Sequence, residues 1–179
     1  MCHFITLVAP TDDVAALSAV MKRHGRGASP VDNASIRKVL GDADRQFLTT
    51  RDHCDCGTVL ASGPDDPDAA EEGFAKEAGR LKRKGWSAAK IARAMEGRRK
   101  AEARPDDRAP DSIDLWAAVL RDLGEELKLP HAGLVVRLYS GAIEAETFDA
   151  LRREAPAGAP LNETLASMRQ DEVTVFRLK

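Results

Sequence analysis

The chain has 179 residues, of which 43% are hydrophobic and 31% charged, the balance of a soluble globular protein long enough to bury a core without disulfides. Its formal net charge of -2 predicts no general attraction to nucleic acid or anionic lipid. No apolar run reaches the roughly 20 residues that span a bilayer, and the opening segment lacks the basic region of a secretory signal. We therefore expect a cytoplasmic protein without a membrane partner, and the abundance of Ala, Arg, Gly and Asp suggests a bacterial one.

The first elements predicted along the chain are a strand and a helix. Residues 4–8 form a short apolar, β-prone run that Pro10 stops, which predicts a buried strand. Thr11 is placed to cap the helix that follows, and Gly25 to close it. Residues 26–45 predict a loop with one helical turn. Residues 46–50 predict a second strand, and residues 58–60 continue into the core.

The middle of the chain has helical propensity. A break between Pro64 and Pro67 starts a helical region that runs to about residue 104, and Ser87 is placed to cap its second segment. Ser112 can cap a further helix, whose apolar residues recur at helical spacing as far as Leu127. The sequence thus predicts helices over much of the region between the two groups of strands.

The last third of the chain returns to strands. Residues 132–139 predict a central strand, residues 162–168 a short helix and residues 173–178 a final strand. Together these elements predict a single α+β domain over residues 1–179, with a helical insertion at about residues 66–128. Its mixed or antiparallel sheet would hold about four strands from the N- and C-terminal parts, with the helical middle packed on one face.

The cysteines gather in two short clusters that also contain histidines. The clustered thiols and imidazoles, which are the ligands that zinc prefers, are Cys2, His3, His53, Cys54 and Cys56. If the first two strands pair antiparallel, Cys2 and Cys54 meet at one end of the sheet; if they pair parallel, the clusters are separated. The sequence therefore predicts a metal site, with zinc as the expected ion, that joins the N-terminal strands.

Other interpretations of the same cysteines stay open. Cysteine is often a small buried hydrophobic residue, and Cys54 and Cys56 could both lie in the core. Cys2 or Cys54 could instead be the nucleophile of a cysteine-dependent enzyme. An odd number of cysteines with a Cys-x-Cys pair favours reduced thiols over a structural disulfide.

A basic segment covers residues 76–104, where lysine and arginine far outnumber acidic residues. Such a segment is usually a solvated helical face, although a local positive patch can also bind nucleic acid or an acidic protein. The chain shows no phosphate-binding glycine loop, no serine elbow and no His-Glu-x-x-His motif. We therefore predict a non-catalytic binding or regulatory protein with an unknown protein or acidic partner. A cysteine-dependent enzyme is the first alternative, and nucleic-acid binding through residues 76–104 the second.

Overall fold

The structure is a computed structural model that describes residues 2–50, 53–61, 74–75, 78–83, 85–102 and 111–178. The chain divides into two compact units: residues 1–64 together with 110–179, and residues 65–109. The predicted break at Pro64 to Pro67 lies outside the described residues.

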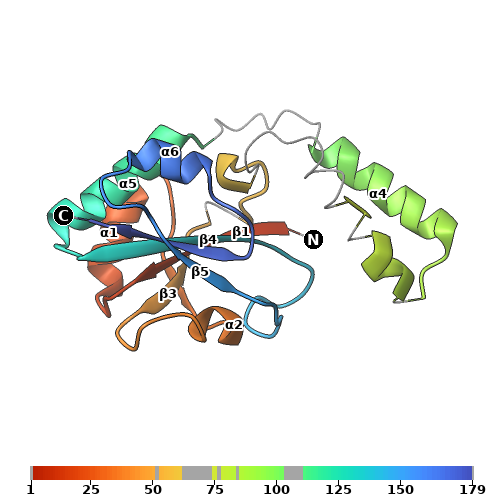
Figure 1. The fold of residues 1–179 in the computed structure, drawn as a ribbon, viewed down its shortest axis with the longest axis horizontal. Coiled ribbons are helices and arrows are strands. Elements are labelled where there is room, and N and C mark those ends of the chain that lie inside the picture. Colours follow the sequence, from red (N-terminus) through yellow and green to blue (C-terminus); the bar gives the residue numbers. More distant parts are fainter. Residues whose placement is uncertain are drawn as a thin grey trace. The chain divides into compact units, whose positions relative to one another are not determined.

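A six-stranded mixed sheet forms the centre of the first unit (Figure 1). Its order is β2-β3-β1-β4-β6-β5, and every neighbouring pair is antiparallel except β5 and β6, which are parallel. The strands are β1 (Cys2–Ala9), β2 (Ser29–Val31), β3 (Arg45–Leu48), β4 (His131–Tyr139), β5 (Leu151–Glu154) and β6 (Glu172–Arg177). The predicted α+β class is confirmed, whereas the prediction of about four strands falls short by the two edge strands, β2 and β5.

One face of the sheet carries the larger core. Alternate residues of β1 point to this face, where they meet the apolar sides of α1 (Val14–Arg23) and α5 (Ile113–Glu126). Helix α6 (Leu161–Ala166) and the 3-10 turn η1 (Val59–Ala61) contribute to the same core. The fully buried side chains of this face include Ile5, Leu7, Leu17, Met21, Leu60, Trp116, Leu120, Leu123 and Phe176.

The opposite face has a smaller core and a helix of its own. Val8, Val135, Val173 and Val175 pack there against Ile36 of the short helix α2 (Ala34–Arg37). Figure 1 shows α5 and α6 on one side of the sheet and α2 on the other. Helices therefore lie on both faces, which differs from the prediction of a single covered face.

The sequence predicted the N-terminal cap of α5 correctly but not that of α1. Helix α1 is capped by the Asp13 carboxylate, which accepts from the Ala16 N–H at 2.9 Å, and the predicted cap Thr11 instead accepts from the Asp13 N–H. Asp13 takes this role because the helix starts at Val14, two residues later than Thr11 would allow. Ser112 caps α5 as predicted, through the Leu115 N–H at 3.1 Å.

The second unit contains α4 (Ala88–Glu102), which Ser87 begins by accepting from the Lys90 N–H at 3.4 Å. Described basic side chains on and before this helix, such as Arg83 and Lys90, are exposed. Of the predicted basic segment 76–104, residues 76–77, 84 and 103–104 lie outside the described residues.

No helix among the described residues is long and apolar enough to cross a membrane.

Candidate metal centre

The antiparallel pairing of β1 with β3 brings the two cysteine clusters to one end of the sheet. Thr6 pairs with Leu48 and Ala9 with Arg45, so β3 runs back toward the start of β1 and its exit loop passes beside Cys2. The sulfurs of Cys2, Cys54 and Cys56 all lie within 4.8 Å of one another. Three thiols at this spacing form a group that could hold a metal ion.

The two histidines of the prediction lie beside this group without belonging to it. His3 follows Cys2 in β1, and successive strand residues point to opposite faces of a sheet. His53 is exposed and precedes Cys54 in the loop. Among the described residues, the ligand atoms gathered within 4.8 Å of one another are the three sulfurs.

The three thiols lie at one end of the sheet, close to the protein surface. Cys2 and Cys54 are partly buried and Cys56 is exposed. Gly57 adopts a left-handed conformation with φ of 85°, which lets the chain turn directly after Cys56. The interpretation of Cys54 and Cys56 as core residues is therefore wrong, since neither is buried.

The pKa of the Cys56 thiol is raised to about 12, mainly by desolvation, although the residue as a whole is exposed. The thiols of Cys54 and Cys2 contribute to this increase, whereas the His3 N–H, which donates to the Cys56 sulfur at 3.4 Å, opposes it. A raised pKa disfavours the thiolate form that nucleophilic chemistry needs.

A buried ion network that the sequence analysis did not predict anchors the cysteine loop. Asp55, between Cys54 and Cys56, ion-pairs through Oδ1 with Nη1 of Arg26. The Arg26 guanidinium ion-pairs through Nη2 with Asp111 and stacks on Trp116 at 4.5 Å. The side chains of Arg26, Asp55 and Asp111 are 3%, 0% and 4% exposed, so the network has left water almost completely.

Asp111 connects this network to the helical face of the sheet. Its Oδ2 accepts from the Thr58 hydroxyl at 2.8 Å and from the indole N–H of Trp116 at 2.8 Å. Its Oδ1 accepts from the Val59 N–H at 3.3 Å. Two carboxylates thus neutralise the Arg26 guanidinium, so this cation contributes little to stabilising a nearby thiolate.

Desolvation is also the largest influence on Asp55, whose pKa is raised above its ordinary range. The Ile5 N–H and the Arg26 guanidinium both lower this pKa, and the neighbouring Asp111 carboxylate raises it again. The pKa of Asp55 is raised overall because two carboxylates share one guanidinium in an environment that excludes water.

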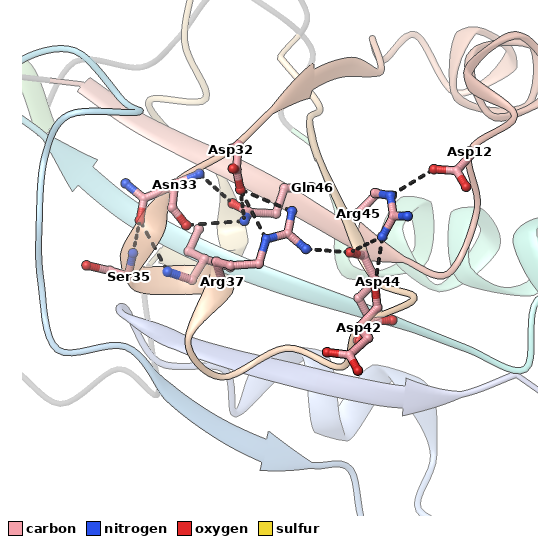
Figure 2. Close-up of polar contacts among 10 residues, drawn as sticks. Asp12, Asp32, Asn33, Ser35, Arg37, Asp42, Asp44, Arg45 and Gln46 are labelled. Atoms are coloured by element: carbon pink, nitrogen blue, oxygen red, sulfur yellow. Dashed lines mark hydrogen bonds and ion pairs between the residues drawn. The ribbon is translucent and has the colours of Figure 1, made fainter.

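A hollow of about 380 Å³ at the edge formed by β2 and β3 is the other candidate site. Figure 2 shows that its arginines are already paired: Arg37 donates to Asp32 at 3.0 and 3.1 Å, and Arg45 donates to Asp12 at 2.8 Å. Because these exposed arginines are each paired with a carboxylate of the protein, the hollow offers no unpaired arginine to an anion. The thiol group is therefore the better candidate.

Comparison of the chain with protein-family models, curated proteins and solved structures found no match.

Proposed function

We propose that this protein is a non-catalytic binding or regulatory protein that holds a zinc ion on the thiols of Cys2, Cys54 and Cys56. The supporting observation is the gathering of the three sulfurs within 4.8 Å of one another, from two parts of the chain about fifty residues apart. Thiolates favour zinc among the abundant divalent ions, because sulfur is a soft ligand. The bound ion ties the start of β1 to the loop that follows β3.

Zinc in such sites is usually four-coordinate, so one ligand remains to be supplied. His53, which precedes Cys54 in the same loop, is the better candidate, because His3 points to the opposite face of β1 from Cys2. A solvent molecule is the alternative at the exposed side of Cys56. Reduced thiols at the surface favour a reducing compartment, which supports a cytoplasmic location.

Elemental analysis of the protein purified under reducing conditions tests the proposal. We expect about one zinc per chain, and a sulfur-to-metal charge-transfer absorption when cobalt replaces zinc, because cobalt(II) reports thiolate ligands directly. Cys54→Ser should weaken this absorption. A metal-free protein whose three thiols titrate freely, with or without added zinc, would contradict the proposal.

Histidine variants identify the fourth ligand. His3→Ala or His53→Ala should alter the visible cobalt spectrum if that imidazole coordinates, whereas neither variant changes it if solvent completes the site. His24→Ala is the matched control. His24 is a partly buried histidine whose ring bonds to Asp122 of α5 at 2.8 Å, so its imidazole is already engaged by a carboxylate and its removal should leave the cobalt spectrum unchanged.

Nucleic-acid binding by the second unit is a second candidate function. Lys82, Arg83, Lys90 and Arg93 are exposed, which gives this part of the chain a local positive charge. Neutralising Arg83, Lys90 and Arg93 together should then weaken retention on duplex DNA, and wild-type affinity should fall with salt at a log-log slope of about -0.9 per phosphate neutralised. A wild-type protein that shows no retention at low salt would remove this candidate.

A further inference from the structure

Asp55 takes the place of a missing strand beside the start of β1. Strand β3 ends at Leu48, which pairs with Thr6, so the edge of β1 from residue 5 back to residue 2 extends beyond its partner. An unpaired strand edge must find other hydrogen-bond partners. The loop after β3 provides them.

The backbone groups of His3 and Ile5 on this edge are bonded to the loop. The Asp55 N–H donates to the His3 carbonyl at 2.7 Å, and the Ile5 N–H donates to Asp55 Oδ2 at 2.8 Å. Thr49 completes the set, since both its N–H and its hydroxyl donate to the Ile5 carbonyl, at 3.1 and 3.0 Å. Main chain and side chain of residue 55 together fix its position along β1.

The other carboxylate oxygen of Asp55 fixes the loop from the opposite side. It is ion-paired with Arg26, which is itself held by Asp111 and the Trp116 ring. A charged group that is buried this completely is strongly stabilised by its partners and costly to separate from them. The flanking residues Cys54 and Cys56 have little freedom to leave β1 while these contacts persist.

We propose that Asp55 is the positioning residue of the thiol site, holding the sulfurs of Cys54 and Cys56 against Cys2 before any metal ion arrives. The inference rests on the proposed metal-binding function. Groups that orient metal ligands without touching the metal typically change metal affinity 10–100-fold when they are removed. Asp55 acts in this way through the loop rather than as a ligand, because its oxygens are taken by Ile5 and Arg26.

The test compares Asp55→Asn with the wild type. Asparagine keeps the size of the side chain, but it has only one accepting oxygen, because its amide nitrogen is a donor. It cannot accept from both the Ile5 N–H and Arg26, so the loop loses one attachment. Arg26 keeps Asp111 as a counter-ion, and no unpaired charge is left in the interior. We expect zinc affinity, measured by competition with a chromophoric chelator, to fall about 10–100-fold.

A metal-independent measurement separates this inference from the proposed function. In the metal-free Cys56→Ser background, where Cys2 and Cys54 are the remaining thiols, a short bifunctional thiol reagent that fluoresces only after both arms have reacted should cross-link the protein rapidly when Asp55 is present and much more slowly when Asp55→Asn is added. Asp44→Asn is the matched control, because Asp44 is 4% exposed and also binds a backbone N–H, of Gly41 at 3.0 Å, and a basic side chain, His131 at 2.7 Å. It should leave both zinc affinity and cross-linking unchanged.

Each outcome decides one of the two claims. Equal zinc affinity and equal cross-linking with and without Asp55→Asn would overturn the positioning role and leave metal binding intact. A wild type that binds no zinc would refute the proposed function, and cross-linking alone would then decide whether Asp55 gathers the thiols. Should Asp55→Asn fail to fold, Asp111→Asn, which frees Arg26 at its far end, takes its place with a smaller expected loss of the same sign.

Discussion

Tyr139 shows how one residue links the end of the sheet to its second face. It pairs with Cys2 across β1 and β4, is 2% exposed, and packs edge-on against Phe4 at 5.9 Å and Phe148 at 6.4 Å between ring centroids. Its hydroxyl finds no hydrogen-bond partner among the described residues. The ring therefore stabilises the fold by packing, while the buried hydroxyl makes no hydrogen bond with the described part of the protein.

Removing this hydroxyl should not harm the protein. We expect Tyr139→Phe to leave the free energy of unfolding unchanged or to raise it by about 1 kcal/mol, because a buried group without a partner is destabilising. Chemical denaturation measures the change. A loss of more than about 1 kcal/mol would indicate that the hydroxyl has a partner after all.

The same residue should make the protein sensitive to high pH. Burial, the largest cause, raises the pKa of Tyr139 to about 12 from its ordinary value of about 10, and the carboxylates of Asp171 and Glu146 also raise it, against the lowering effect of Arg137. Between these two values the unfolded chain releases the proton and the folded chain keeps it, so stability falls as pH rises. At 1.36 kcal/mol per pKa unit, the loss is about 2–3 kcal/mol by pH 12.

Tyr139 is the single tyrosine of the chain, so its phenolate absorbance follows this titration directly. Comparison with Tyr139→Phe isolates its share of the pH dependence, because Cys56 also has a raised pKa in this range and is present in both proteins. A phenolate signal at the ordinary pKa in the folded protein would contradict the expected burial.

At the candidate site, the sequence predicted the clustering of the three thiols but not the residues that hold the cysteine loop in place. Cys2, Cys54 and Cys56 could be named because thiols are rare and their clustering is visible without a structure. Asp55, Arg26 and Asp111 could not, since charged residues are common and usually exposed, and their pairing depends on three loops meeting in the fold. An acidic residue between two cysteines was the one available signal.

Among the elements, those with an apolar pattern were predicted and the sheet edges were missed. Strands β1, β4 and β6 are buried and read as apolar runs, and α5 shows a clear apolar stripe. Strand β2 contains Pro30, and β5 is mostly charged, with Leu151 64% exposed. Proline and charged residues are common on edge strands because these residues discourage pairing with other chains. The same residues interrupt the apolar pattern from which a strand is predicted.

A close approach between α5 and the end of the chain gives an element-scale test. A Cβ atom at Gly124 would lie 2.9 Å from the Leu178 Cβ and 3.1 Å from its carbonyl oxygen, so α5 and the residue after β6 meet without room for a side chain. We expect Gly124→Ala to lower the free energy of unfolding by about 1–3 kcal/mol, the usual cost of overpacking.

Gly97→Ala in α4 provides the control of opposite sign. Nothing lies within 4 Å of a Cβ at Gly97, and alanine is favoured over glycine inside a helix by about 0.5–1 kcal/mol. Helicity measured by circular dichroism should therefore stay equal or rise in this variant. A Gly124→Ala variant as stable as the wild type, or more stable, would show that the contact with Leu178 does not restrict this position.

At the scale of the whole molecule, the group of three thiols and the hydrophobic core are separate. The buried residues of both core clusters, on the two faces of the sheet, include no cysteine among the described residues. The loop bearing Cys54 and Cys56 is anchored by the Arg26 network rather than by the thiols themselves. This differs from a zinc finger, in which the metal provides most of the folding free energy.

Metal removal should therefore lower the melting temperature without unfolding the protein. An ion present at 1,000 times its Kd stabilises by about 4.1 kcal/mol, and a domain of this size shifts by about 2–4 °C per kcal/mol, so chelation should lower Tm by about 8–16 °C. Far-ultraviolet circular dichroism at 25 °C should not change, because both cores and the Arg26 network persist. Cys54→Ser should show no chelator-dependent shift. Loss of the dichroism signal on chelation would instead mean that the thiol site holds the first unit together, and that Asp55 cannot keep the loop in place without the metal.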